Sequence, residues 1–339
     1  MLFTIAVFRF PTDDLRISFQ LLAEVGAYAV FAYLLWGINK WMAMFAIIVC
    51  ISSLFPQYDK ATFLASHAVF YGLLWYYVVY EKGDVDLILN AMCLIAMVNV
   101  FFLCLQFLNI DPLFDPLSNG AKDLCTGVMG NQNETSAVLA LCFPAFLRKK
   151  WWLLIPIVLV GLALSKSFGG VLAVIIGGLY YSWNKIDKRV VVGVFVLLLI
   201  GFLLIDTPGI IHRWDTWVVA AKLYIQHPLL GSGIGHWKYI FVNIDIGGRG
   251  VWMPTAHNEY VQGIFEMGMP FIIILIGFLL ALRIRLKKAN DILVVASIII
   301  LINCFVNFPL HIAVTAYMIL TWIAIIDRSY HGKTEFPTR

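Results

Sequence analysis

The chain has 339 residues, of which 61% are hydrophobic and 13% are charged. Soluble domains contain about 45–50% apolar and about 25% charged residues, so a packed core of this chain could not hide so much apolar surface. The composition excludes a soluble enzyme and a disordered chain, and a net charge of only +4 excludes a nucleic-acid partner.

The apolar runs predict an all-α polytopic membrane protein that forms one membrane domain over residues 1–339. A membrane-spanning helix needs about 20 apolar residues, and about eleven runs (ten to twelve) approach this length. These candidate spans are 20–38, 41–55, 62–80, 87–108, 134–147, 151–165, 168–183, 190–206, 259–282, 291–306 and 308–326. The apolar residues 1–10 are too short to span, and they lack the basic region and cleavage site of a signal peptide.

The positions of Lys and Arg predict the orientation of the chain in the membrane. The dense basic clusters at 148–150, 185–189 and 283–288 all fall in connections on one side of the predicted spans. Cytoplasmic loops carry the excess of basic residues, so this side and the C-terminus are expected to be cytoplasmic. Segments 109–133 and 207–258 then face outward, and connections of the length of 207–258 usually carry function.

The outer segment 207–258 contains a predicted interfacial helix and a glycine-rich turn. Residues 213–226 place apolar side chains at near-helical spacing between polar ones, which predicts an amphipathic helix on the membrane surface that Pro228 ends. Glycines follow at 231, 233 and 235, where no strand precedes them as a dinucleotide-binding loop would require. They predict a tight turn with close backbone approach.

The segment closes on His257, after which Glu259, Gln262 and Glu266 share one face of a predicted helix. Thr255 or Asn258 is the expected cap of that helix. Carboxylates that enter a membrane span usually face a cavity or a partner, so this stripe predicts a polar cavity that opens outward. Histidine at its mouth is suited to act as a general base, whereas the alternative is that it only anchors the loop.

Two further polar elements precede predicted helices. In residues 130–135, Asn133 is the expected N-cap, and the amides of that helix start favour an anion; a cap without a ligand is the alternative. At Ser165–Ser167, Lys166 requires a counter-charge, which could be Glu266, Glu24 or an anionic substrate. Structural and functional roles of this lysine stay open.

The outward basic residues point to a phosphate ligand rather than to a metal. Arg213 and Arg249 present planar guanidinium groups that suit paired phosphate oxygens. The outer segments contain no HxxxH, CxxC or DxD pattern, so neither a metal nor another cofactor is expected.

In this order, these elements resemble the O-antigen ligase and polymerase superfamily of bacterial envelope glycan enzymes. The resemblance rests on Gly130–Asn133, Ser165–Ser167, Arg213–Gly235 and Ala256–Gly268, and the flanking spans match only in hydropathy. It implies a C-type glycosyltransferase architecture in the bacterial inner membrane, with metal-independent transfer on the periplasmic side. The implied donor is an undecaprenyl-diphosphate-linked glycan, and the implied acceptor is a glycan, a lipid core or a glycolipid. Membrane lipids are expected to surround the protein.

The resemblance also implies roles for individual residues. His257 matches the histidine proposed to activate the acceptor hydroxyl, and Arg213 matches the arginine thought to hold the diphosphate. The family commonly has Ser-Arg-Gly where this chain has Ser165-Lys166-Ser167, so Lys166 or Arg249 would supply the second phosphate contact. The remaining predicted substrate-binding residues are Asn131, Asn133, Glu259 and Glu266.

Several alternatives stay open at this point. Within the class, the chain could be a ligase, a polymerase or a protein O-oligosaccharyltransferase. The rival class is a secondary transporter or a flippase of lipid-linked glycan, with Glu24, His67, Glu266 and His311 as coupling sites. A transporter of this kind should have related halves, and the sequence shows no such symmetry.

Overall fold

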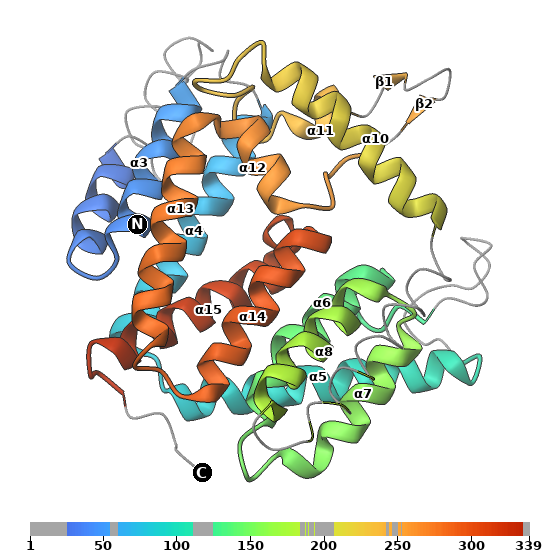
Figure 1. Cartoon of the computed structure of the whole chain (residues 1–339). Helices are drawn as coiled ribbons and strands as arrows, with labels where there is room; N and C mark the ends of the chain where they lie inside the picture. The colour runs from blue at the N-terminus through green and yellow to red at the C-terminus, as the bar shows by residue number, and fades with distance from the viewer. Residues whose placement is uncertain are drawn as a thin grey trace, which may run out of the picture. The chain divides into compact units, whose positions relative to one another are not determined.

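The computed structural model describes residues 26–54, 60–110, 125–183, 187, 189, 193, 207–241, 244–245, 250–251 and 253–334 (Figure 1). The chain divides into two compact units, each built from separate stretches of sequence. The first unit comprises Met1–Tyr77, Arg213–Ala256 and Tyr260–Ile284, and the second comprises Val78–His212, His257–Glu259 and Arg285–Arg339.

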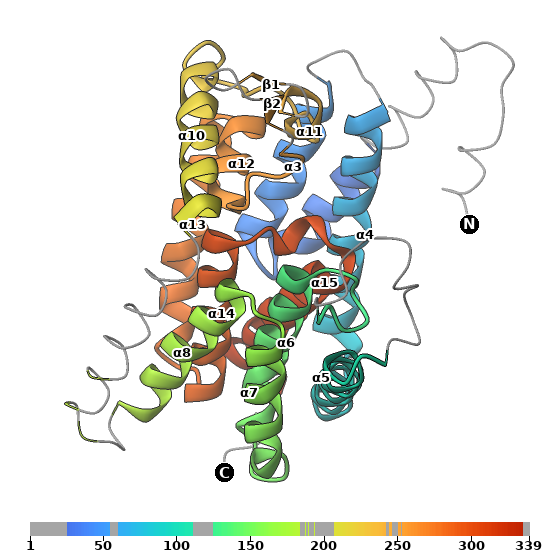
Figure 2. The same cartoon turned by 90° about the vertical axis from the view of Figure 1, so that its right-hand side faces the viewer.

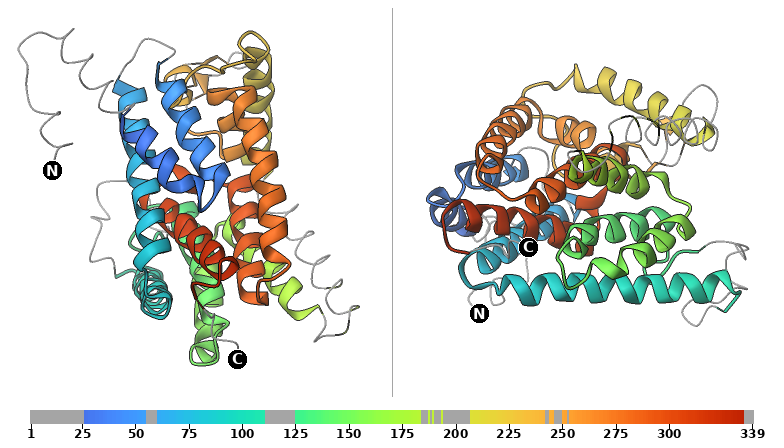
Figure 3. Two further views of the ribbon diagram at one scale, coloured as in Figure 1. Left: turned by 90° about the vertical axis from the view of Figure 1, so that its left-hand side faces the viewer. Right: turned by 60° about the horizontal axis from the view of Figure 1, so that its bottom comes forward.

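The first unit contains long helices and a small irregular region. Its elements are the helix Gly26–Trp36, α3 (Lys40–Leu54), α11 (Trp237–Ile240) and the antiparallel ribbon of β1 (Ile244–Asp245) and β2 (Gly250–Val251). It also contains most of α4 (Lys60–Lys82), α10 (Thr207–Tyr224), α12 (Glu259–Met267) and α13 (Met269–Leu286). Helices α3 and α13 lie side by side (Figure 3). A Cβ atom at Gly277 of α13 would come within 2.0 Å of the Trp41 ring of α3, so glycine permits this contact.

The second unit is a helical bundle around one central helix. It contains α5 (Val85–Phe107), α6 (Gln132–Phe146), η1 (Trp152–Leu154), α7 (Ile155–Leu164), α8 (Phe168–Ser182), α14 (Asp291–Val306), η2 (Pro309–His311) and α15 (Ala313–Tyr330). Helix α6 contacts α5, α7, α8, α14 and α15 (Figure 2). Every residue from Thr135 to Phe146 is buried. A helix that is apolar on all sides is expected at such a central position.

Close backbone approach and one side-chain hydrogen bond fix the neighbours of α6. A Cβ atom at Gly170 of α8 would lie 2.1 Å from the hydroxyl of Ser136 of α6, so only glycine allows this crossing. From α15, the indole of Trp322 donates a 2.9 Å hydrogen bond to the carbonyl of Leu141. The N-terminal turn of α6 and the start of α8 are thereby held close together.

Two of the described helices, α5 and α13, are long and apolar enough to cross a membrane. Along α13 the exposed side chains include Ile273, Ile276, Leu280 and Ile284, which share one helix face. Soluble monomers rarely expose contiguous apolar surface of this kind. These features are compatible with a membrane location.

The predicted helical fold is confirmed for the described residues, apart from the short β1–β2 ribbon. Six predicted spans each coincide with one helix, namely 41–55, 62–80, 87–108, 134–147, 168–183 and 291–306. The predicted span 190–206 and the start of 20–38 lie outside the described residues, apart from residue 193. Eleven membrane spans stay a prediction, because several of the helices are shorter than a full membrane crossing.

The single helix predicted over 259–282 is wrong, since the structure divides it into α12 and α13 at Gly268. Gly268 adopts a left-handed φ of 70°, and a Cβ there would lie 2.6 Å from the main-chain nitrogen of Gly231. The next residue, Met269, donates its N–H to the carbonyl of Pro228 at 3.0 Å. The acidic stripe therefore lies on the short α12 and not on a long apolar helix.

Candidate functional site

The segment Asn307–Ile312, here called the α14–α15 connector, joins parts of the second unit that are distant in sequence. The side-chain amide of Asn307 donates a 3.2 Å hydrogen bond to the carbonyl of Asn133 in the first turn of α6. The adjacent ring of Phe308 packs edge-on against His257, with 4.7 Å between ring centroids. The connector therefore brings the predicted base close to the start of α6.

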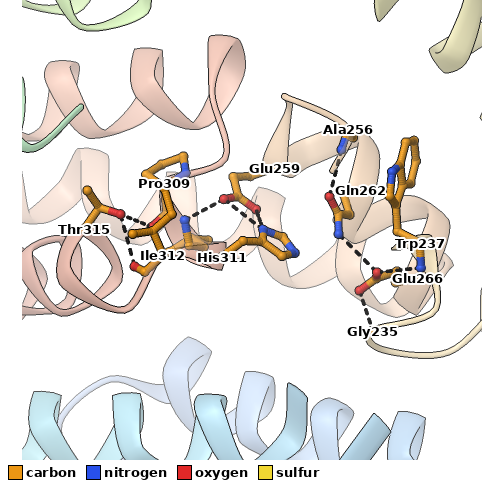
Figure 4. Close-up of polar contacts among 11 residues, drawn as sticks. Gly235, Trp237, Ala256, Glu259, Gln262, Glu266, Pro309, His311, Ile312 and Thr315 are labelled. Atoms are coloured by element: carbon orange, nitrogen blue, oxygen red, sulfur yellow. Dashed lines mark hydrogen bonds and ion pairs between the residues drawn. The ribbon is translucent and has the colours of Figure 1, made fainter. Parts of the chain in front are cut away.

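A buried carboxylate holds the second half of the connector. Glu259 accepts the N–H of Leu310 at 2.6 Å, and its other oxygen lies 3.0 Å from Nδ1 of His311 (Figure 4). The hydroxyl of Thr315 donates to the carbonyl of Pro309 at 2.5 Å, which fixes the short η2 turn onto α15. Proline has no N–H to continue a helix, and these side-chain bonds add to the backbone bond of the turn, from the N–H of His311 to the carbonyl of Phe308 at 3.1 Å.

The start of α6 differs in one respect from the prediction. Asn131, and not Asn133, is the N-cap: it has an extended backbone, and its side chain accepts the N–H groups of Asn133 at 2.8 Å and Glu134 at 3.3 Å. Asn133 is the second residue of the helix, and its side-chain oxygen accepts the hydroxyl hydrogen of Ser167 at 2.7 Å. The expected cap residue instead connects α6 to the turn between α7 and α8.

That turn presents Lys166 to the surface of the second unit. Lys166 is exposed, and in the described part of the chain it makes no ion pair. Burial raises the pKa of the Cys125 thiol, and the positive charge of Lys166 offsets a part of this rise. Just beyond the turn, a Cβ at Gly169 would lie 3.2 Å from the amide nitrogen of Asn307, so the connector also approaches α8.

Lys166 and His257 share an unusual backbone conformation. Together with Asn109, they are the non-glycine residues with positive φ among the described residues, at 50°, 51° and 61° respectively. Asn and His enter the left-handed region more readily than most residues, whereas a lysine there is uncommon. A residue in this region is held against a cost of about 1–2 kcal/mol, and such residues cluster at functional sites.

In the first unit, the carboxylate of Glu266 accepts hydrogen bonds from neighbouring groups of the same unit. It accepts the N–H groups of Gly235 and Trp237, both at 3.0 Å, and the side-chain amide of Gln262 at 3.2 Å (Figure 4). Gln262 in turn accepts the N–H of Ala256 at 3.0 Å. These bonds account for a buried carboxylate without a ligand.

The tight turn predicted at the glycine run is confirmed. Gly231, Gly233 and Gly235 all have positive φ, at 68°, 100° and 80°. A Cβ atom at Gly231 would lie 2.6 Å from the carbonyl carbon of Glu266, so the backbone approach is as close as expected. The turn serves to bring N–H groups to the Glu266 carboxylate.

The remaining predicted residues belong to the first unit or lie outside the described residues. Arg213 is half-buried on α10 in the first unit, whereas Lys166 and His257 belong to the second. The predicted interfacial helix 213–226 is confirmed as a helix, and α10 begins earlier, at Thr207. Arg249 and Glu24 lie outside the described residues.

Sequence reasoning did not assign the connector to the site. Asn307 was not singled out, and His311 was considered only as a coupling site of a transporter. The signal that could have found them is a short run, Asn307-Phe308-Pro309-Leu310-His311, which places polar and turn-forming residues between two apolar helices.

Among the residues that the structure describes, no three His, Cys, Asp or Glu side chains are placed to hold a metal ion. No protein-family model matches this chain, and no curated protein matches it either.

Proposed function

We propose that this chain is a multi-pass glycosyltransferase of the bacterial inner membrane, of the O-antigen ligase or polymerase type. It would transfer a glycan from undecaprenyl diphosphate to a carbohydrate acceptor on the outer side. The observation that best supports the proposal is the α14–α15 connector, which contacts both His257 and the Asn133 element. These are two of the segments on which the family resemblance rests.

In the proposed reaction, His257 accepts the proton of the acceptor hydroxyl while the hydroxyl oxygen attacks the anomeric carbon. The bond between this carbon and the diphosphate oxygen breaks, and the diphosphate leaves with the electron pair. Lys166, exposed and without an ion pair among the described residues, contributes a cation for the diphosphate. Arg213 supplies the other phosphate contact by the resemblance alone.

The exposed apolar stripe of α13 supports the membrane part of the proposal. Ile276 and Leu280 are both more than half exposed on a helix of 18 residues, and a bilayer would cover such a face. The outward orientation of the site follows from the basic clusters of the sequence and is part of the same proposal.

The decisive experiment measures transfer by the purified full-length chain in lipid nanodiscs with a labelled undecaprenyl-diphosphate glycan. His257→Ala is expected to lower kcat by about 10²–10⁴-fold, the usual contribution of a general base. A matched control is His331→Gln, because His331 also bonds a side chain, the hydroxyl of Tyr80 at 3.0 Å. Full transfer by both His257→Ala and Arg213→Ala would overturn the proposal.

The same assay separates the alternatives within and outside the class. A ladder of products from a defined repeat unit indicates a polymerase, whereas a single shifted acceptor band indicates a ligase. A protein acceptor would indicate an O-oligosaccharyltransferase. Movement of the lipid-linked glycan across proteoliposomes without a new glycosidic bond would identify a transporter or flippase instead.

A further inference from the structure

The carboxylate of Glu259 is almost fully buried, with 6% of its side chain exposed. Its partners are the main-chain N–H of Leu310 at 2.6 Å and Nδ1 of His311 at 3.0 Å. Burying an ionised carboxylate is costly unless hydrogen bonds and an opposite charge compensate for it. Both of these polar partners belong to the α14–α15 connector, so the carboxylate is committed to this segment and not to a ligand.

The bonds to Glu259 add to a short backbone turn, in which the N–H of His311 donates to the carbonyl of Phe308 at 3.1 Å. Pro309 interrupts the helical hydrogen bonding after α14, and Phe308 before it has a non-helical backbone at φ −128° and ψ 52°. Without Glu259, the N–H of Leu310 would lose its acceptor. The position of Leu310 and His311 therefore depends in part on this carboxylate.

The connector transmits this constraint to the proposed base. Phe308 lies two residues before Leu310, and its ring packs edge-on against the ring of His257 at 4.7 Å. His257 itself precedes Glu259 by two residues, so the carboxylate and the imidazole meet the same short connector. A shift of Leu310 and His311 would move the aromatic surface that orients the imidazole.

We infer that Glu259 is a positioning residue for His257 and acts through the α14–α15 connector. The inference rests on the proposed function, because it gives Glu259 a role in the step that His257 performs. It replaces the expectation that Glu259 binds substrate. The effect on the reaction is then on kcat and not on the affinity for the donor.

Two substitutions at Glu259 separate the charge from the hydrogen bond. In Glu259→Gln the side-chain oxygen still accepts the N–H of Leu310, but an NH2 group replaces the carboxylate oxygen that lies 3.0 Å from Nδ1 of His311. We expect kcat to fall about tenfold with an unchanged KM for the donor, because small displacements of a catalytic group are costly. Glu259→Ala removes both bonds and should lower kcat further, while His311→Gln should reproduce the loss seen in Glu259→Gln.

A matched control is Glu81→Gln, which removes the same charge from a carboxylate that pairs with Lys333 at 3.0 Å. Its kcat and KM should equal those of the wild type. A second readout needs no activity: the rate at which diethyl pyrocarbonate modifies His257 in the intact full-length protein, followed by mass spectrometry of the peptide that contains His257. This rate should rise in Glu259→Gln and in Phe308→Leu, and it should stay at the wild-type value in Glu81→Gln.

The two readouts distinguish the inference from the proposed function. If the wild type transfers no glycan, the proposed function fails, and the modification rate of His257 still tests the link to Glu259. A donor KM that rises with unchanged kcat and unchanged His257 modification would make Glu259 a substrate ligand and overturn the inference. Wild-type kcat and wild-type modification in Glu259→Gln would overturn it as well. Where Glu259→Ala fails to fold, Glu259→Gln and His311→Gln carry the test.

Discussion

The side-chain amide of Asn307 donates a 3.2 Å hydrogen bond to the main-chain carbonyl of Asn133, joining the end of α14 to the first turn of α6. Asn307 is buried and has an extended backbone, and its own N–H donates to the carbonyl of Asn303 at 2.8 Å. The amide of Asn307 therefore fixes the point at which the α14–α15 connector leaves α14. The contacts of the connector with His257 and Glu259 follow from where it leaves α14.

Asn307→Asp tests this relationship. The substitution replaces a donating NH2 group with a carboxylate that faces a carbonyl oxygen in a buried position. We expect the free energy of unfolding to fall by about 1–3 kcal/mol, the usual cost of a buried group left without its partner. Thermal unfolding of the purified protein in detergent measures the change.

The control is Asn290→Asp at the other end of α14. Asn290 is the N-cap, and its side-chain oxygen accepts the N–H of Leu293 at 3.0 Å. Aspartate keeps this acceptor and adds a negative charge at a helix N-terminus, so stability should stay equal or rise slightly. Equal losses in both variants would show that Asn307 acts only as a polar residue at a helix end.

A second prediction concerns the exposed face of α13. Ile276 lies near the middle of the helix and is 54% exposed, whereas Met269 at its first position is 43% exposed. In a bilayer, Lys at position 276 should cost about 2.5–3.5 kcal/mol, and Lys at position 269 should cost far less because its side chain reaches the interface. An exposed position in water would tolerate either substitution within about 0.5 kcal/mol.

The measurement is the thermal unfolding of each purified variant in lipid nanodiscs. Ile276→Lys should lower the midpoint of unfolding clearly, and Met269→Lys should leave it near the wild-type value. If both variants unfold like the wild type, α13 does not cross the membrane in the predicted way.

Sequence reasoning predicted most helices because long apolar runs determine them directly. The run 87–108, for example, became α5 (Val85–Phe107) within two residues at each end. The break at Gly268 was missed for a physical reason. It depends on close approach to Gly231, which is distant in the sequence, so a local pattern shows only a glycine inside an apolar stretch.

The sequence selected residues of the candidate site without showing their partners. The family resemblance selected His257 and Glu259, and polar residues at helix starts selected Asn133. Which group each side chain contacts depends on how α6, α8 and α14 pack. For this reason spacing alone could not show that the N-cap is Asn131 and not Asn133. It could not show that Glu259 pairs with His311 either.

A third prediction uses two glycines with opposite surroundings. Gly231 has a φ of 68°, and an added Cβ would lie 2.6 Å from the carbonyl carbon of Glu266, whereas Gly178 in α8 has nothing within 4 Å. Gly231→Ala should therefore be destabilising by more than about 1 kcal/mol, because the backbone conformation is strained and a main-chain atom blocks the methyl group. Gly178→Ala should be neutral or stabilising by up to about 1 kcal/mol, since alanine favours a helix.

Thermal unfolding of the two variants against the wild type gives the comparison. Because the Gly231 turn brings N–H groups to Glu266, limited proteolysis of Gly231→Ala should cut first within residues 226–241. Equal stability of the two variants would contradict the close approach of Gly231 to α12.

The last prediction separates the backbone of Lys166 from its charge. Lys166 has a φ of 50°, a conformation that glycine adopts without the cost of about 1–2 kcal/mol that other residues incur. Lys166→Gly should therefore keep or raise the free energy of unfolding, although the amine that we propose for the diphosphate is lost. Lys166→Arg keeps the charge and the strain, so its stability should match that of the wild type.

Binding of undecaprenyl diphosphate to the protein in nanodiscs should weaken about tenfold in Lys166→Gly, as expected for the loss of one charged contact, and little in Lys166→Arg. A stable Lys166→Gly variant that binds the diphosphate like the wild type would show that the strained lysine serves the turn and not the ligand.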